Sequence, residues 1–193
     1  MCINSVLYYL IGILSLLVFT LTILLRYYVV LSQTDEITSI KNYRGFCVLM
    51  RKILLKHRKG NTPFTLVLID IDRFRNYNSQ GYAFGDYVLK EFVQFLKQEL
   101  PFGAKIARFK FGDEFVIVIP NDFNATIEKI NQIQESFRLK TFTYPITKQS
   151  FEVRFSYGAS QFDEGTQSLQ SLLFNAENSL KENKEKVIKC NEN

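Results

Sequence analysis

Cysteine and histidine are scarce in this 193-residue sequence. The three cysteines (Cys2, Cys47 and Cys190) are widely separated, which excludes a disulfide framework and a tetrahedral cysteine-ligated metal site. The single histidine, His57, lies in the basic run "LLKHRKGN", which indicates a solvated helix end rather than a catalytic base. Any metal site in this chain is therefore expected to use oxygen ligands.

Charged residues are absent from residues 2–25. The run "INSVLYYLIGILSLLVFTLTILL" would form a helix roughly 35 Å long, enough to cross a hydrocarbon core of about 30 Å. A secretory signal peptide is the competing interpretation, but the run lacks a basic start, a short apolar core and a small-residue cleavage site. The basic residues from Arg26 onward lie on the C-terminal side of the run, the side that the positive-inside rule places in the cytoplasm.

We therefore expect two parts. Residues 1–33 form a single-pass anchor in the inner (cytoplasmic) membrane with a short juxtamembrane segment, and residues 34–193 form a cytoplasmic domain. No coiled-coil heptads and no sensory domain fit between the two parts.

The formal net charge is +5, and the densest basic run lies between Arg51 and Lys59. Two interpretations of this run stay open. It contacts anionic lipid headgroups below the anchor, or it is the solvated face of a helix whose apolar stripe contains Phe46, Leu49, Ile53 and Leu54. Aromatic interleaving and recognised nucleic-acid motifs are missing, so we expect no nucleic-acid partner.

The hydrophobic pattern of the rest of the chain predicts an α+β domain. "FTLVLID" at residues 64–70 is an apolar, β-branched run typical of a central strand buried on both faces. "AKIARFKF" and "EFVIVIP" flank Gly112 and Asp113 and predict a hairpin. A further strand is expected over residues 151–160, and helices are expected over residues 43–58, 85–100, 123–137 and 168–189. Without the first and last helices the order is βαββαβ, typical of a ferredoxin-like or palm antiparallel sheet with flanking helices.

Four acidic residues lie where the first strand of that sheet meets the hairpin. Asp70 and Asp72 end the first strand, and Asp113 and Glu114 occupy the hairpin tip. Carboxylates gathered in one place repel one another unless a cation offsets them, and oxygen ligands without histidine or cysteine suit Mg²⁺ or Mn²⁺. Magnesium usually completes its coordination with water and substrate phosphate, so the pattern favours a nucleoside triphosphate substrate and two-metal nucleotidyl transfer.

Several blocks in this order resemble the GGDEF domain family of diguanylate cyclases, which condense two GTP into cyclic di-GMP. The blocks are "TDEITSIKNYRGF", "DIDRFRNYN", "GYAFGD", "FGDEF" and "SYGAS", and the resemblance runs from about Thr34 to Lys189. It implies GTP as substrate and a homodimer for catalysis, because each 3′-hydroxyl attacks the other nucleotide. The alternatives are a catalytically inactive GGDEF module that acts as a GTP-binding or protein-interaction scaffold, and another palm-like nucleotidyl transferase.

The resemblance also implies roles for particular residues. Two Mg²⁺ (or Mn²⁺) ions per active site would be held by Asp70, Asp113 and the backbone carbonyl of Ile71. Asp113 and Glu114 of the signature would be catalytic, with Asp113 helping to deprotonate the attacking hydroxyl. The implied substrate-binding residues are Asn78 and Asp86 for guanine, Phe74 and Arg75 at the turn that approaches the phosphates, and Lys184 for the terminal phosphate.

The sequence departs from the family pattern at several positions. Phe111 replaces the first glycine of the signature, and Ile188 occupies the place of a phosphate-binding arginine four residues after Lys184. The span from Asn78 to Asp86 is one residue shorter than usual, and Tyr82 replaces a customary histidine. The Arg-x-x-Asp pair of the family's product-inhibition site falls on Phe102 and Lys105, so we expect no feedback site of that type.

Overall fold

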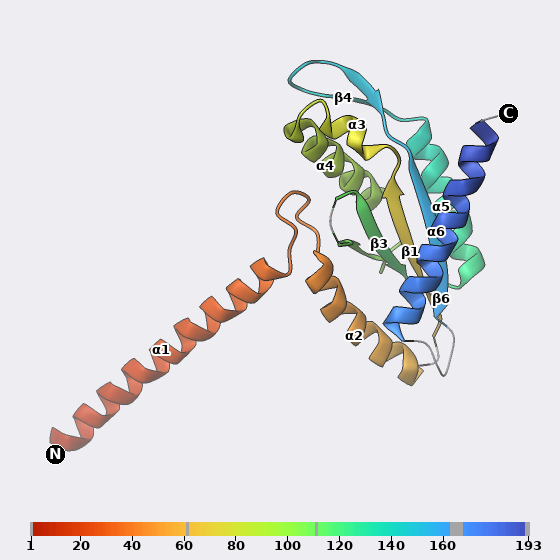
Figure 1. Cartoon of the computed structure of the whole chain (residues 1–193). Helices are drawn as coiled ribbons and strands as arrows, with labels where there is room; N and C mark the ends of the chain where they lie inside the picture. The colour runs from red at the N-terminus through yellow and green to blue at the C-terminus, as the bar shows by residue number, and fades with distance from the viewer. Residues whose placement is uncertain (1, 61, 111, 163–167, 192–193) are drawn as a thin grey trace.

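The N-terminal helix projects from one folded body (Figure 1). The computed structural model describes residues 2–60, 62–110, 112–162 and 168–191. Helix α1 covers Cys2–Ser32, and its segment Leu7–Ser32 is apolar and long enough to cross a membrane. The large apolar side chains of this segment are exposed, as expected for a helix that has lipid rather than protein around it.

A four-stranded antiparallel sheet forms the centre of the body. Its strands are β1 (Phe64–Ile71), β2 (Lys105–Arg108), β3 (Glu114–Ile119) and β6 (Phe155–Phe162), arranged in the order β2-β3-β1-β6. β1 is an inner strand, as its continuous apolar sequence predicts. The predicted α+β fold with a βαββαβ core is therefore confirmed.

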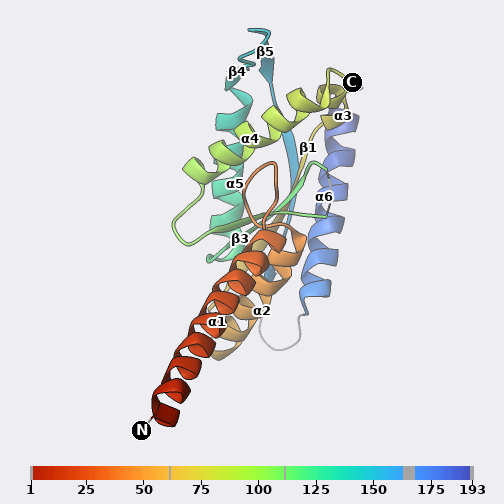
Figure 2. The same cartoon turned by 90° about the vertical axis from the view of Figure 1, so that its left-hand side faces the viewer.

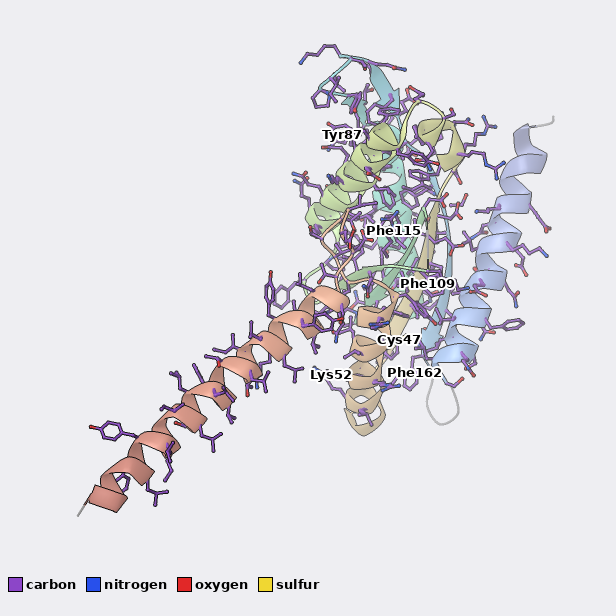
Figure 3. All side chains as sticks on the ribbon, turned by 60° about the vertical axis from the view of Figure 1, so that its left-hand side comes forward. Cys47, Lys52, Tyr87, Phe109, Phe115 and Phe162 are labelled. Atoms are coloured by element: carbon purple, nitrogen blue, oxygen red, sulfur yellow. The ribbon has the colours of Figure 1, made fainter. Side chains whose placement is uncertain are left out.

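Helices cover both faces of the sheet (Figure 2). Helices α4 (Tyr82–Glu99) and α5 (Phe123–Arg138) pack on the face that includes Val67, Ile69 and Ile71 of β1. Helices α2 (Tyr43–Gly60) and α6 (Leu169–Asn191) pack on the other face. Phe115 belongs to the first core, whereas Phe109 and Phe162 belong to the second (Figure 3). The apolar run of β1 is continuous because each of its faces is buried.

Three local features differ from the sequence prediction. A short helix, α3 (Phe74–Asn78), follows β1, and α4 begins at Tyr82 rather than at residue 85. The strand expected over residues 151–160 is divided: β5 (Ser150–Glu152) pairs with β4 (Thr141–Thr143), and β6 begins at Phe155. The rings of Phe142 and Phe151 stack at 5.6 Å and pack beside α4, which draws β5 away from the main sheet.

The end of α1 is bonded to the start of α2. The Asn42 side chain donates from Nδ2 to the Ser32 carbonyl at 3.0 Å, and its backbone N–H donates to the Gln33 carbonyl at 3.0 Å. Gly45 lies so close to the Gln33 carbonyl that a Cβ would collide with it. The ten residues between the two helices therefore form a folded connection rather than a flexible linker.

Helix α6 packs closely on β6 because Gly158 has no side chain. A Cβ at this position would collide with the α6 backbone at Ala176 and Leu180. Further along α6, Asn183 Nδ2 donates to the Tyr157 carbonyl at 2.9 Å. These contacts set the distance of α6 from the sheet and thereby the position of the residues beyond Leu180.

We expect Gly158→Ala to lower the free energy of unfolding by about 1–3 kcal/mol, because the added methyl group forces α6 away from β6. Chemical denaturation of the purified chain in detergent measures this loss. The matched control is Gly12→Ala in α1, where no atom lies within 4 Å of the added Cβ. Equal stability of the two variants would contradict the packing argument.

Candidate active site

Two carboxylates face each other across the β1–β3 pair. Asp70 is the register partner of Glu114. Directly opposite residues of an antiparallel pair place their side chains on the same face of the sheet, with Cβ atoms about 4.5–5.5 Å apart, and like charges there are destabilising. The structure thus brings together the end of the first strand and the hairpin, as the sequence predicts.

Asp113 lies next to this pair at the end of the hairpin loop. Its backbone carbonyl accepts a hydrogen bond from the Ile71 N–H at 3.3 Å, which holds the loop against the last residue of β1. Burial and the nearby Asp70 carboxylate raise the pKa of the Asp113 carboxyl above its usual value of 3.8. The same two causes raise the pKa of Glu114. This junction therefore favours a bound cation or proton.

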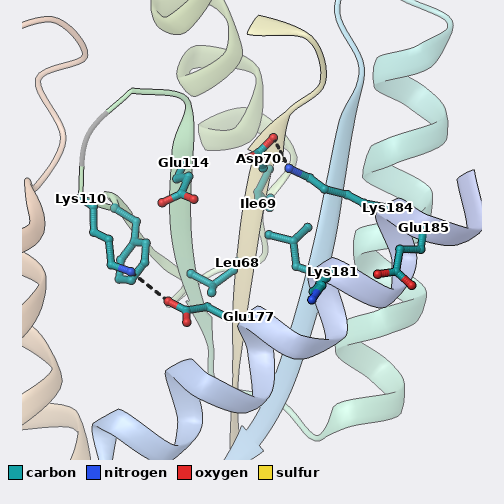
Figure 4. Close-up of a pocket in the computed structure, with 11 residues that line it drawn as sticks. Leu68, Ile69, Asp70, Lys110, Glu114, Glu177, Lys181, Lys184 and Glu185 are labelled. Atoms are coloured by element: carbon teal, nitrogen blue, oxygen red, sulfur yellow. Dashed lines mark hydrogen bonds and ion pairs between the residues drawn. The ribbon is translucent and has the colours of Figure 1, made fainter. Parts of the chain in front are cut away.

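Lys184 supplies positive charge to the acidic pair. Its Nζ atom lies 2.7 Å from Asp70 Oδ1, with the two side chains 38% and 16% exposed (Figure 4). The partly exposed ammonium group is on a helix, α6, whereas its carboxylate partner is fixed in a strand. Because the lysine side chain is long and flexible, it can exchange this carboxylate for another anion without movement of the backbone.

A cavity of about 330 Å³ separates the hairpin from α6. Leu68, Phe109 and Leu180 contribute apolar surface, and Asp70, Glu114 and Lys184 contribute charge. A second ion pair joins the hairpin to α6, with Lys110 Nζ 3.0 Å from Glu177 Oε1 (Figure 4). The side chains of this pair are 52% and 45% exposed, so solvent screens it and it contributes little to stability.

The fourth acid of the predicted cluster, Asp72, has a separate hydrogen-bond partner. Its Oδ1 atom accepts from the Ser156 hydroxyl at 2.7 Å. Burial, only partly offset by that hydrogen bond, raises the pKa of the Asp72 carboxyl, and the Asp70 carboxylate adds to the rise. Asp72 and Asp70 line a common pocket at the turn between β1 and α3, so Asp72 is part of the same electrostatic environment.

Arg108 is a site residue that the sequence analysis did not identify. Its guanidinium donates from Nε and Nη2 to the Gly112 carbonyl at 2.8 and 2.6 Å, and from Nη1 to both Asp35 carboxylate oxygens at 3.1 Å. Burial opposes charge on Asp35, but hydrogen bonds from Thr38 and the charge of Arg108 outweigh it and lower the pKa of Asp35. One sequence feature could have identified Arg108: it is a basic residue at the end of the apolar strand that leads to the hairpin.

The predicted guanine-binding residues lie on neighbouring elements. Asn78 ends α3, and Asp86 lies in the first turns of α4. The Asn78 side chain packs directly on Gly85, where it leaves no room for a Cβ, so the amide lies beside the residue that precedes Asp86. Tyr82, at the start of α4, is exposed.

The predicted phosphate-turn residues differ in what they offer a ligand. The Phe74 side chain is buried in the core that contains α4, so this residue can reach a ligand through its backbone only. The Arg75 side chain is exposed. Phe111 lies outside the described residues, as does the side chain of Ile188, so the structure gives no account of either departure from the family pattern.

The donor set fits a magnesium ion that is bound together with a phosphate group. Within residues 2–60, 62–110, 112–162 and 168–191 no three acidic, histidine or cysteine side chains converge closely enough to hold an ion by themselves. Magnesium needs only one or two carboxylates when water and substrate phosphates supply the other ligands. Asp70 and Asp113, whose carboxylates interact electrostatically, are the side chains that could provide them.

Residues 32–189 match the family model described as "Diguanylate cyclase, GGDEF domain". The chain is 29% identical over 160 residues to diguanylate cyclase A of Treponema denticola, covering 80% of this chain and 42% of that protein. It is also 29% identical over 142 residues to an uncharacterized membrane protein of Staphylococcus aureus, covering 72% of this chain and 39% of that protein. The chain thus spans about two fifths of the length of these curated relatives.

Solved structures share the fold. The coiled coil and GGDEF domain of DgcB from Caulobacter crescentus, in complex with c-di-GMP, superposes with a TM-score of 0.80 at 20% identity, covering 89% of this chain and 90% of that one. The GGDEF domain of FimX from Pseudomonas aeruginosa gives a TM-score of 0.71 at 18% identity, covering 80% of this chain and 94% of that one. At these identities the likeness establishes the fold alone.

We expect Asp113→Asn to raise the free energy of unfolding by on the order of 1 kcal/mol at pH 7.5, because it removes one of the mutually repelling carboxylates. When folding raises the pKa of a carboxyl group, that group stabilises the folded protein at pH values below the pKa it has in the unfolded state. This contribution is lost as pH rises through the pKa that the group has in the folded state. The advantage of the variant should therefore shrink as pH falls toward about 4. Denaturation of both proteins between pH 4 and 8, without divalent cations, measures it; a pH-independent difference would contradict the explanation.

Asp35→Ala should destabilise the fold by about 3 kcal/mol, because it leaves the buried Arg108 guanidinium without its charged partner. Urea denaturation provides the measurement. Glu135→Ala is the control, since it breaks an exposed ion pair with Arg138 and should cause no measurable change. Similar losses in the two variants would show that the Asp35–Arg108 pair has no special structural role.

Proposed function

The chain belongs to the GGDEF domain family, and on that premise we propose that it is a membrane-anchored diguanylate cyclase that condenses two GTP into cyclic di-GMP. The observation that carries this proposal is the pairing of Asp70 with Glu114, beside Asp113 and within reach of Lys184. Family membership gives the class of reaction, and the charge arrangement at this junction suits a metal-bound triphosphate.

The proposed reaction forms a bond from a 3′-oxygen of one nucleotide to the α-phosphorus of the other and releases pyrophosphate. Two such steps join two GTP molecules into the cyclic product. Asp70, Asp113 and the Ile71 carbonyl would hold Mg²⁺ ions, and bound Mg²⁺ would supply positive charge that stabilises the attacking and leaving oxygens. Asp113 also accepts the proton of the hydroxyl, directly or through water, a role to which a raised pKa is suited.

In this proposal Lys184 exchanges its partner when the substrate binds. The ammonium lies 2.7 Å from Asp70 Oδ1 in the free protein and would pair with the terminal phosphate of a bound triphosphate. Glu114, the register partner of Asp70, lies beside that carboxylate. Lys184 thus offsets one of the negative charges of the junction in the free protein.

Asn78 and Asp86 are proposed to read the guanine base. A carboxylate that accepts hydrogen bonds from two guanine N–H groups makes a charge-assisted contact that adenine cannot reproduce. The packing of the Asn78 side chain on Gly85 supports this assignment, because it holds the amide beside the start of the segment that carries the carboxylate. Phe74, through its backbone, and Arg75 are assigned to the approach of the phosphates.

Catalysis requires two domains face to face, because each holds one nucleotide and attacks the other. We propose that residues 1–33 anchor the chain in the inner membrane as a single span, with residues 34–193 in the cytoplasm. The apolar segment Leu7–Ser32 supports the anchor. Tethering two copies in one membrane raises their effective concentration and favours the catalytic homodimer.

A second candidate function is a catalytically inactive GGDEF scaffold that binds GTP or a protein partner. The sequence departures at Phe111, Tyr82 and Ile188 favour this alternative. The absence of a preformed three-ligand metal site among the described residues is compatible with it. The retained Asp70, Asp113 and Lys184 favour the enzyme.

The deciding test incubates the full chain in lipid nanodiscs with GTP and Mg²⁺ and measures cyclic di-GMP by mass spectrometry. We expect product from the wild type and at least a hundredfold less from Asp113→Asn, because the variant loses both a metal ligand and the proposed base. Glu135→Gln, an exposed carboxylate on α5, is the matched control and should keep full activity.

The same preparations are assayed for GTP binding. Binding without product, also at high protein concentration that promotes dimerisation, would support the scaffold. If neither product nor binding is found, both functions that involve GTP are excluded. Product that persists in Asp113→Asn would contradict the assigned role of this residue.

A further inference from the structure

Three basic side chains from separate parts of the chain line one pocket at the turn between β1 and α3. We name it the turn pocket: it has a volume of about 800 Å³, and its charged lining residues are Asp70, Asp72, Arg73, Glu152, Arg154 and Lys184. We propose that Arg154, assisted by Arg73, binds the terminal phosphate of the nucleotide together with Lys184. This inference rests on the proposed function and assigns a phosphate ligand that is not among the residues implied by the family pattern.

The backbone fixes Arg154 opposite the turn. The Asp72 N–H donates to the Arg154 carbonyl at 2.8 Å, which continues the antiparallel pairing of Ile71 with Phe155 by one more position. Arg154 therefore lies directly across from Asp72, two residues before Phe74. A single hydrogen-bonded rung separates it from the last residue of β1.

The Arg154 guanidinium is available to a ligand. Its Nη2 atom forms a long ion pair with Glu152 Oε2 at 3.8 Å, and the two side chains are 66% and 58% exposed. Such a pair contributes little to stability and exchanges readily for a stronger partner. The planar guanidinium, with its fork of N–H donors, matches a phosphate group better than this distant carboxylate does.

Arg73 reaches the pocket from a left-handed backbone conformation, with φ 56°. This conformation is unfavourable for residues other than glycine and persists where the surrounding structure requires it. This backbone conformation lets the chain pass from the end of β1 to the start of α3 within three residues. The arginine side chain lines the pocket. The turn thereby contributes a second guanidinium to the pocket.

Charge balance explains why the pocket needs Arg154. Its lining contains three acids, Asp70, Asp72 and Glu152, and three bases, Arg73, Arg154 and Lys184. Without Arg154 the lining would carry an excess of negative charge and would repel a triphosphate. The family's additional phosphate-binding position is the apolar Ile188 in this chain, so Arg154, one residue before β6, would provide the charge that α6 lacks at that position.

The experiment measures binding of 3′-deoxy-GTP, 3′-deoxy-GDP and 3′-deoxy-GMP with Mg²⁺ to the full chain in nanodiscs by calorimetry. These nucleotides lack the attacking hydroxyl, so no product forms. We expect Arg154→Gln to weaken triphosphate binding roughly tenfold to a hundredfold, the usual effect of one charge-assisted hydrogen bond. Monophosphate binding should change less than about twofold, because it lacks the terminal phosphate. Arg154→Lys should fall between the wild type and Arg154→Gln.

Arg51→Gln is the matched control, since it makes the same substitution on the exposed side of α2, outside the turn pocket, and should leave all three affinities unchanged. Equal losses for the three nucleotides, or no loss for the triphosphate, would overturn the role of Arg154 while leaving the proposed function intact. A wild type that binds no guanine nucleotide would overturn both. Unfolding curves of each variant confirm that the comparison is made on folded protein.

Discussion

The antiparallel register between β1 and β3 is the constraint on which the candidate site depends. The register is fixed by burial, because β1 contacts one core with Val67 and Ile69 and the other with Leu66 and Leu68. A slip of one residue would exchange the two sets of side chains between faces that are both already filled. The apolar core thus holds Asp70 opposite its acidic partner in spite of their repulsion, and the chemistry at the strand end depends on packing along the whole strand.

Positive charges around the acidic junction differ in how firmly they are held. The Arg108 guanidinium is buried and has bonds to both a carboxylate and the Gly112 carbonyl, so it acts as a fixed part of the hairpin. Lys184 and Arg154 are partly or largely exposed and pair with carboxylates at the edge of the site. The first kind of cation maintains the shape of the backbone, and the second kind can change partners. The proposed function, in which the site accepts a highly charged substrate and releases a charged product, needs both.

The sequence predicted the main sheet because its signals are local: a long apolar run for β1, and a Gly-Asp reversal between two apolar runs for the hairpin. The β4–β5 pair escaped prediction because its strands are three residues each and depend on ring packing between Phe142 and Phe151. The bond between Arg108 and Asp35 joins residues 73 positions apart, which no local pattern reveals. The acidic residues were identified in the sequence from their place at a strand end and a hairpin tip. Which basic residues pair with them could be seen only in the folded structure.

The connection between α1 and α2 has a geometric consequence. The last turn of the anchor helix is bonded to Asn42, and Asp35 within the same connection is bonded to the arginine that holds the hairpin. In a bilayer, every copy of the chain would therefore carry its hairpin at one height above the lipid surface and at a restricted tilt. Two copies would meet by lateral diffusion and rotation about the membrane normal, a search in two dimensions instead of three.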